Sequence, residues 1–174
     1  AAPVIWDRDI VQNVRCARAV VVNAGIANAA TGASGMEMCR QTAAFTAKAL
    51  NIPENQVLLG STGVIGPNLP IDRITAGVAA MADALSDTLD AGTAASRAIM
   101  TTDTISKEIA VEFTVGGKVC RMGGIAKGSG MIHPNMATML VFITTDAAIS
   151  ADMLQKALST DVTGTFNMLS VDGD

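Results

Sequence analysis

Strand-like and helix-like patterns alternate along this chain, and that order restricts it to an α/β fold. Residues 19–23, a run rich in β-branched side chains, predict a strand that is followed by a turn-rich stretch. Residues 56–59 predict a second, short strand. Between the two strands, Ser34 and Glu37 have the spacing of a capping box, and Asn51 is expected to stop the helix that begins there. The repeating positions of that helix are Met38, Thr42, Phe45 and Ala49.

The pattern continues with a second amphipathic helix after Pro70. Its apolar stripe consists of Ile71, Ile74, Val78, Met81 and Leu85. A shorter helix is predicted over residues 93–99. Alternation over residues 109–115, followed by two glycines, predicts a hairpin that returns over residues 119–122.

The last part of the chain predicts one strand and one helix. Residues 138–143 are apolar without alternation, which indicates a strand covered on both faces. Ser150 is placed to cap a helix that carries Met153, Leu154, Ala157 and Leu158. Repeats, low-complexity segments and linkers are not evident, so we predict one α/β domain over residues 1–174.

Composition narrows the class of protein. Hydrophobic residues make up 49% and aromatic residues 3%, so the core must be built mainly from aliphatic side chains and Met. A net charge of -4 argues against nucleic acid or an anionic membrane as partner and favours a small polar metabolite. The spacing of Cys16, Cys39 and Cys120 matches no metal or disulfide pattern, so we interpret them as core thiols in the cytoplasm. We expect neither a membrane span nor an export signal.

Three polar clusters fall at the ends of predicted elements. Ser61-Thr62-Gly63 could form an oxyanion hole, because glycine lets main-chain amides approach a ligand oxygen, or it could be an ordinary strand-to-loop turn. Residues 101–104 could bind a ligand or form an Asx or Ser/Thr turn. Lys127, between glycines, could bind a substrate carboxylate, lower the pKa of a neighbouring amine, or be a solvated loop lysine.

Thr138, at the start of the last predicted strand, is the strongest candidate nucleophile. His133, the single histidine, is separated from it by Pro134 in a loop where pairing is awkward, and we assign it a structural or supporting role. Cleavage of the Ala137-Thr138 peptide would instead give Thr138 a free α-amine, with an ordinary pKa of about 7.7 to 8, as its own base. Its Oγ could perform that cleavage by attacking the Ala137 carbonyl.

Taken in order, these segments resemble the glutamate N-acetyltransferase family, also called ornithine acetyltransferases, over almost the whole chain. The most specific match is the cleavage motif Ala-Thr-Met-Leu at residues 137–140 with its upstream Lys127-Gly128. The other matching runs are Asn23-Ala24-Gly25-Ile26-Ala27-Asn28, Ser61-Thr62-Gly63, Thr101-Thr102-Asp103-Thr104, Gly124-Ile125-Ala126-Lys127-Gly128, Asn135-Met136-Ala137-Thr138-Met139-Leu140 and Val171-Asp172-Gly173-Asp174.

The resemblance implies a self-cleaving enzyme of arginine biosynthesis that moves an acetyl group from N-acetylornithine to glutamate. Thr138 would be the acetylated nucleophile, Thr62 and Gly63 the oxyanion hole, and Lys127 and Thr101 the contacts to the amino-acid substrate. No metal or organic cofactor is expected. The family fold is an α/β sandwich of stacked sheets with outer helices, related to the β-peptidyl aminopeptidases.

Several points stay open at this stage. The family sequence continues on both sides of this chain, so the chain is either uncleaved, a partial segment, or two pieces numbered together. We expect its partner to be its own β chain or the remaining half of the precursor, in a hetero-oligomer of α and β chains. Acetyl-CoA as a second donor, in the bifunctional type of the family, is left open. The alternatives are a related N-terminal-nucleophile hydrolase that uses Thr138 to pass the acyl group to water, and an inactive fragment that only binds amino acids or a partner chain.

Overall fold

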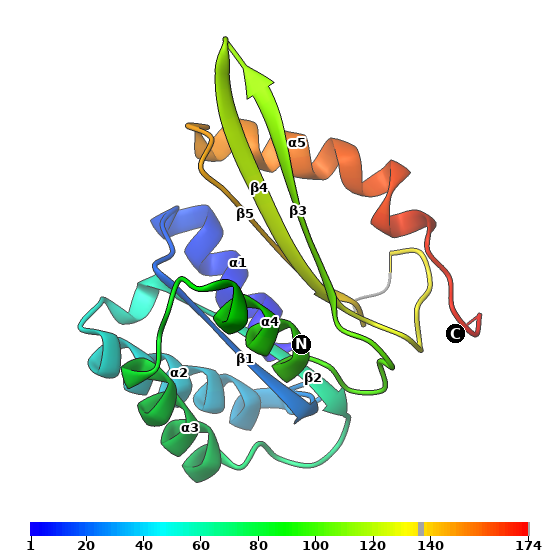
Figure 1. Ribbon diagram of the computed structural model, residues 1–174. Coiled ribbons are helices and arrows are strands. Elements are labelled where there is room, and N and C mark those ends of the chain that lie inside the picture. Colours follow the sequence, from blue (N-terminus) through cyan, green and yellow to red (C-terminus); the bar gives the residue numbers. More distant parts are fainter. Residues whose placement is uncertain (136–137, 174) are drawn as a thin grey trace. The chain divides into compact units, whose positions relative to one another are not determined.

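The structure is a computed structural model that describes residues 1–135 and 138–173. Its contacts group the chain into two compact units, Ala1–Ala91 and Gly92–Asp174 (Figure 1). Each unit combines helices with a small sheet, which confirms the predicted α/β class. The boundary falls inside α4 (Leu89–Ala98), where the sequence suggested no division, and the single domain over residues 1–174 stays a prediction.

The first unit is built around two parallel strands joined by a helix. β1 pairs with β2 in one continuous register, from Ala19 opposite Val57 to Ile26 opposite Val64. Parallel strands need a long crossover, and α2 supplies it. The elements of this unit are α1 (Ala2–Asp9), η1 (Ile10–Val14), β1 (Ala19–Ile26), α2 (Gly32–Leu50), η2 (Glu54–Gln56), β2 (Val57–Val64) and α3 (Ile71–Asp83).

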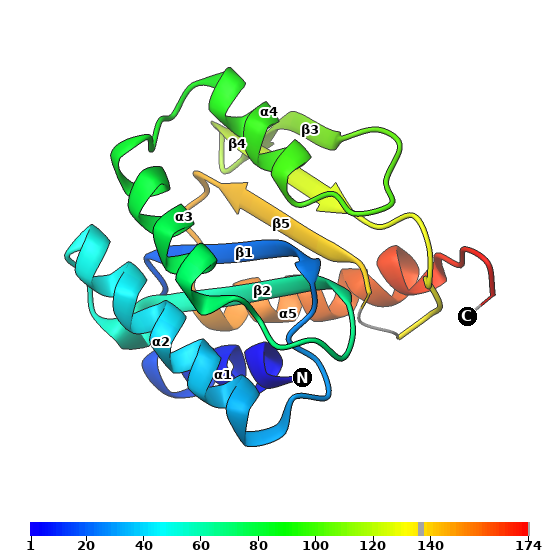
Figure 2. The same ribbon diagram turned by 90° about the horizontal axis from the view of Figure 1, so that it is seen from below.

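An N-terminal helix that the sequence analysis did not predict completes this unit. α1 lies beside α2, and both contact β2 (Figure 2). The indole Nε1 of Trp6 donates to the Val57 carbonyl at 2.9 Å, and the amide of Leu59 donates to the Asp7 carboxylate at 2.9 Å. These bonds attach α1 to β2. The core beneath them consists of small and aliphatic residues, Ala2, Cys39, Ala43, Ala47, Val57 and Leu59.

The predicted helix in residues 34–50 exists, but its start differs. α2 begins at Gly32 with Thr31 at its N-cap, so the predicted capping box is wrong. Ser34 Oγ donates to the Thr31 carbonyl, and Glu37 pairs with Arg40 at 2.6 Å on the exposed helix surface. The end is as predicted, because Asn51 takes the left-handed conformation that commonly closes helices.

The second unit contains an antiparallel sheet in the order β3-β4-β5. The predicted hairpin is confirmed: Val115 pairs with Lys118, and Gly116 and Gly117 have φ of 58° and 78°, as a tight hairpin turn requires. Figure 1 shows the two long strands of this hairpin beside β5. The elements after α4 are β3 (Lys107–Val115), β4 (Lys118–Lys127), β5 (Leu140–Thr145), α5 (Ala151–Gly164) and η3 (Phe166–Met168).

One expectation about burial in this unit, a strand covered on both faces at residues 138–143, is wrong. β5 is half-buried or exposed, with Ile143 47% exposed, so it is not covered on both faces within this chain. Ser150 caps α5 as predicted, by accepting from the Met153 amide. The apolar residues Met153, Leu154 and Leu158 of this helix are exposed. An apolar sequence pattern indicates which side chains could be buried, but they are buried only where another surface of the protein packs against them.

The cysteines differ in environment. Cys39 is buried, and burial raises the pKa of its thiol to about 11, so the prediction of a core thiol holds there. Cys16 is exposed and Cys120 half-buried, so neither is a fully buried core thiol. Within the described part of the chain, the helices are too short or too polar to cross a membrane.

Candidate active site

Thr62 and Gly63 lie in the first unit, inside β2 and not in the loop that the sequence suggested. β2 continues to Val64, with Thr62 opposite Ala24 and Gly63 opposite Gly25 on β1. Thr62 is buried, 7% exposed. The prediction failed because the glycines at positions 60 and 63 resemble turn residues in the sequence, although both are paired in the strand.

Gly63 has a packing reason to be glycine. Its φ is 132°, and a Cβ at this position would lie 2.2 Å from the carbonyl carbon of Gly25. Any side chain there would collide with the neighbouring strand. The oxyanion-hole role of Thr62 and Gly63 remains a prediction, and it is compatible with two strand backbones that approach this closely.

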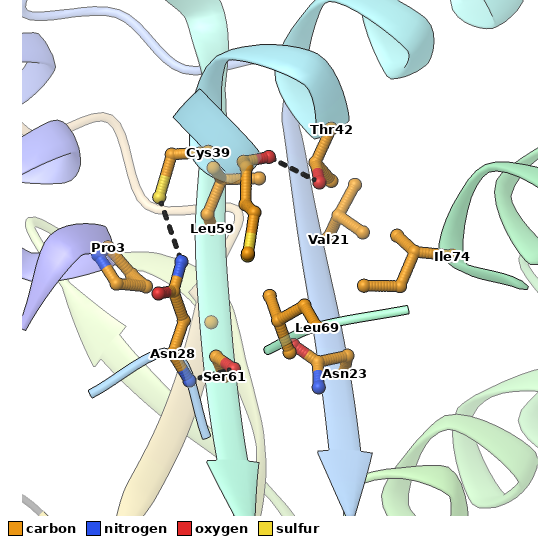
Figure 3. Close-up of a pocket in the computed structure, with 12 residues that line it drawn as sticks. Pro3, Val21, Asn23, Asn28, Cys39, Thr42, Leu59, Ser61, Leu69 and Ile74 are labelled. Atoms are coloured by element: carbon orange, nitrogen blue, oxygen red, sulfur yellow. Dashed lines mark hydrogen bonds between the residues drawn. The ribbon is translucent and has the colours of Figure 1, made fainter. Parts of the chain in front are cut away.

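Asn28 organises the polar end of the same strand pair. Its side-chain Nδ2 donates to the Gly35 carbonyl at 3.0 Å. Nδ2 also donates to Cys39 Sγ at 3.4 Å, and the main-chain amide of Asn28 donates to Ser61 Oγ at 2.8 Å (Figure 3). Thr31 Oγ1 donates to Asn28 Oδ1 at 2.6 Å. Through these bonds the buried residue Asn28 connects the end of β1 with α2 and with Ser61 on β2.

A cavity beside Asn28 is too small for a substrate. Its volume is about 20 Å³, room for about one water molecule. Figure 3 shows Val21, Leu59, Leu69 and Ile74 around it, together with the polar side chains of Asn23, Asn28 and Ser61. Its lining comes entirely from the first unit, and we do not assign an amino-acid ligand to it.

Lys127 is the last residue of β4 in the second unit, and it is only 3% exposed. The alternative of a solvated loop lysine is therefore wrong. Burial lowers the pKa of its ammonium, the negative charge of Asp103 raises it, and the positive charge of Lys107 lowers it further. A buried cation of this kind suits recognition of a carboxylate, because a desolvated charge attracts its partner strongly.

Thr138 lies in a turn immediately before β5 and is half-buried. The antiparallel ladder pairs Lys127 with Leu140, two residues after Thr138. The strands remain close beyond that pair, since a Cβ on Gly128 would lie 3.3 Å from the Met139 side chain. The fold thus brings the end of β4 to the segment that carries Thr138. Ala137, the other side of the predicted cleavage point, lies outside the described residues.

The polar turn at residues 101–104 lies against the end of β4. Asp103 is buried, and its carboxylate accepts from the Gly128 amide at 2.8 Å and from the Thr101 amide at 3.3 Å. Thr102 Oγ1 and Ser129 Oγ share a hydrogen bond of 2.8 Å. The turn that was one alternative for this segment is present, and it brings Thr101 and Lys127, the two predicted substrate contacts, into the same region.

His133 is exposed, and its Nδ1 lies 3.3 Å from the Pro134 carbonyl oxygen. That contact is local and gives no base for Thr138, in line with the awkward geometry inferred from the sequence. The loop around it is held by the C-terminal segment. Val171 donates to the Ile132 carbonyl at 2.8 Å, and the Met131 amide donates to the Asp172 carboxylate.

Three residues that organise these clusters were not singled out individually by the sequence analysis: Asn28, Asp103 and Asp172. Each lay within a quoted motif, but no sequence signal showed which distant amide it would bind. The one signal in the sequence that could have indicated these residues is an acidic or amide side chain placed among small hydroxyl residues or glycines. In residues 1–135 and 138–173, no three His, Cys, Asp or Glu side chains gather as they would around a metal ion.

The fold is shared with two solved structures. One is the crystal structure of the arginine biosynthesis bifunctional protein ArgJ of Bacillus halodurans, with a TM-score of 0.72 and 42% identity over 79% of this chain and 71% of that one. The other is the ornithine acetyltransferase of Mycobacterium tuberculosis in complex with ornithine, with a TM-score of 0.68 and 36% identity over 79% of this chain and 72% of that one. These likenesses define an α/β protein of the ornithine acetyltransferase fold.

The chain belongs to the ArgJ family, whose family model matches residues 1–174. Among curated relatives, the arginine biosynthesis bifunctional protein ArgJ of Gloeobacter violaceus is 47% identical over this whole chain, and the one from Thermotoga neapolitana is 50% identical. This chain spans 42% of the length of the first relative and 43% of the second. The family predicted from the motifs is confirmed, and so is the expectation of a partial segment.

Proposed function

We propose that the protein containing this chain is a self-cleaving acetyltransferase that moves an acetyl group from N-acetylornithine to glutamate. The chain belongs to the ArgJ family, and one observation carries the proposal. Thr138 lies in the turn before β5, next to the end of β4, where Lys127 is buried. A hydroxyl on the segment next to the end of β4 would be well placed to receive an acyl group from a substrate whose carboxylate binds Lys127.

The first step would prepare the nucleophile. Thr138 Oγ attacks the carbonyl carbon of Ala137, the peptide C–N bond breaks, and the Thr138 nitrogen takes the proton from Oγ. This step gives an ester on Oγ and frees the α-amine of Thr138. Water then opens the ester, which leaves a carboxylate on Ala137 and frees the Thr138 hydroxyl. That amine then acts as the base for its own hydroxyl.

The transfer itself would proceed in two half-reactions. Thr138 Oγ attacks the acetyl carbonyl of N-acetylornithine, its proton passes through the α-amine to the departing nitrogen, and ornithine leaves. The glutamate amine then attacks the acetyl ester, the bond from carbon to Oγ breaks, and the proton returns to the hydroxyl. Because the acetyl group travels on Thr138, the reaction requires no metal or organic cofactor.

The other predicted residues would serve binding and charge stabilisation. Lys127 would hold the substrate carboxylate, and Thr101, exposed at the neighbouring turn, would contact the same substrate. Thr62 and the Gly63 amide would stabilise the oxyanion that forms on the acyl carbonyl. Acetyl-CoA would act as an additional acetyl donor if the protein is bifunctional. The β chain that begins at Thr138 would be the obligate partner of the chain that ends at Ala137, and both would lie in the cytoplasm.

Two measurements on the full-length protein test this proposal. Intact mass should show cleavage between Ala137 and Thr138 in the wild type and none in Thr138→Ala. With N-acetylornithine labelled in the acetyl group, label should appear in N-acetylglutamate, and its transfer should be lost in Thr138→Ala by at least about a thousandfold.

The same assay distinguishes the alternatives. Label that appears only in acetate would identify an N-terminal-nucleophile hydrolase and overturn the transferase. A mature protein that stays uncleaved, transfers nothing and is unaffected by Thr138→Ala would indicate a chain that only binds amino acids or a partner.

A further inference from the structure

Asp103 is a buried carboxylate on which three donors converge. Its side chain is 0% exposed, and it lies in the loop between α4 and β3. Lys107 Nζ donates to Oδ1 at 2.5 Å, the Gly128 amide donates to Oδ1 at 2.8 Å, and the Thr101 amide donates to Oδ2 at 3.3 Å. Burial raises the pKa of this carboxyl, but the three hydrogen bonds outweigh burial and the pKa falls to about 2.

The two amide donors belong to the two segments expected to contact substrate. One is the amide of Thr101 itself, and the other belongs to Gly128, the residue after Lys127. The side chain of Asp103 therefore joins the start of the turn at residues 101–104 to the end of β4. The hydrogen bond between Thr102 and Ser129 adds a second, more exposed connection between the same segments.

Asp103 also shapes the charge around Lys127. Among the charged groups that act on the Lys127 ammonium, Asp103 favours the charged form and Lys107 disfavours it. Lys107 is 41% exposed and its positive charge is partly screened by water, whereas Asp103 is fully buried. The buried acid is thus a group that opposes the loss of the proton from Lys127.

We propose that Asp103 is a positioning residue of the acetyltransferase site, which locks the Thr101 turn to the end of β4 and supplies the negative charge beside Lys127. This inference rests on the proposed function for its catalytic consequence. Its structural consequence, the coupling of Asp103 to Lys127 and Gly128, can be measured without any turnover.

The first test uses Asp103→Asn in the full-length protein. An amide has one acceptor oxygen where the carboxylate has two, so at least one of the three donors loses its partner and the charge is gone. We expect KM for N-acetylornithine to rise about tenfold or more, with a smaller change in kcat, and the alkaline limb of the kcat/KM profile to move to lower pH. Asp103→Glu should restore the alkaline limb in part, because it restores the charge.

The matched control is Glu112→Gln. Glu112 is another acid of the same sheet, in an exposed pair with Arg121 at 2.9 Å, and its loss should leave KM and the pH profile within about twofold of the wild type. A lower melting temperature of Asp103→Asn with unchanged KM and pH profile would reduce Asp103 to a structural residue and overturn the proposal.

A second readout separates this inference from the proposed function. In Nζ-labelled protein, NMR should show a lower pKa for Lys127 in Asp103→Asn and a higher one in Lys107→Gln, because the two charges act in opposite directions. The Gly128 amide resonance should shift in Asp103→Asn. Wild-type protein without transferase activity would overturn the proposed function alone; unchanged Lys127 and Gly128 signals would overturn the role of Asp103 whatever the activity.

Discussion

The carboxylate of Asp172 accepts the main-chain amide of Met131, with N···O distances of 3.0 and 2.9 Å to its two oxygens. Ile132 and Val171 form a β-bridge beside this contact, and Asn167 Nδ2 donates to Asn135 Oδ1 at 2.9 Å. The segment before the predicted cleavage point is therefore bonded to a segment well after it. These bonds hold residues 131–135 and residues 167–172 together, so the two segments would stay attached if the predicted cleavage occurs.

The contact between Asp172 and Met131 predicts an effect on self-cleavage. Asp172→Ala leaves the Met131 amide without its carboxylate, and the segment that leads to the cleavage point should lose its fixed position. We expect cleavage to slow by about five- to tenfold, measured as the fraction of intact precursor over time by mass spectrometry. Asp161→Ala, which removes an exposed acid of α5, should cleave at the wild-type rate. Equal rates in all three proteins would show that this contact does not position the bond.

The buried cation Lys127 predicts a defect in substrate use with little loss of folding. Lys127→Met keeps most of the side-chain volume and removes the charge, so the core should tolerate it while the substrate carboxylate loses its partner. We expect kcat/KM to fall about 10- to 100-fold with a nearly unchanged melting temperature. Lys118→Met, at the exposed hairpin end of the same strand, is the control. A collapsed melting temperature with normal kinetics in the surviving protein would contradict this role.

The close approach of Gly63 to Gly25 predicts a loss of stability on substitution. Gly63→Ala would place a Cβ 2.2 Å from backbone and at a positive φ, so the strand pair must separate locally. We expect the free energy of unfolding to fall by about 2–4 kcal/mol, measured by urea denaturation. Gly77→Ala in α3, where the added methyl group meets nothing within 4 Å, should instead stabilise by about 0.5–1 kcal/mol. If both variants were neutral, the strand approach would be looser than described.

Asp7 predicts a pH dependence of stability. Burial raises its pKa from 3.8 to about 6, opposed by the hydrogen bond from the Leu59 amide. Between about pH 4 and pH 6 the folded protein holds a proton that the unfolded chain releases, so stability should fall as pH rises through this window and level off above it. Asp7→Asn retains an acceptor for Leu59 and should remove this dependence.

The measurement for Asp7 is the difference in unfolding free energy between wild type and Asp7→Asn, taken from pH 4 to pH 7.5. Subtraction cancels the other titrating groups. The variant should gain on the wild type as pH rises, and a constant difference across the range would show that Asp7 does not titrate there.

Local pattern was sufficient for several elements because their determinants are neighbours in sequence. Alternation over β3, with the two glycines after it, set the hairpin and its register, and Ser150 capped α5 as expected. The stripe from Ile71 to Val78 predicted α3. Local pattern failed for the start of α2 and the end of β2, where Thr31, Gly60 and Gly63 take positions that depend on the neighbouring strand and loop.

The sequence by itself determined the family, the α/β class and the identity of the candidate nucleophile Thr138, because these depend on the order of motifs along the chain. Only the tertiary structure showed that Lys127 is buried, and that Asp103 binds an amide 25 residues away while Asp172 binds one 41 residues away. Burial and long-range hydrogen bonds depend on which surfaces meet after folding. No local pattern of residues contains that information.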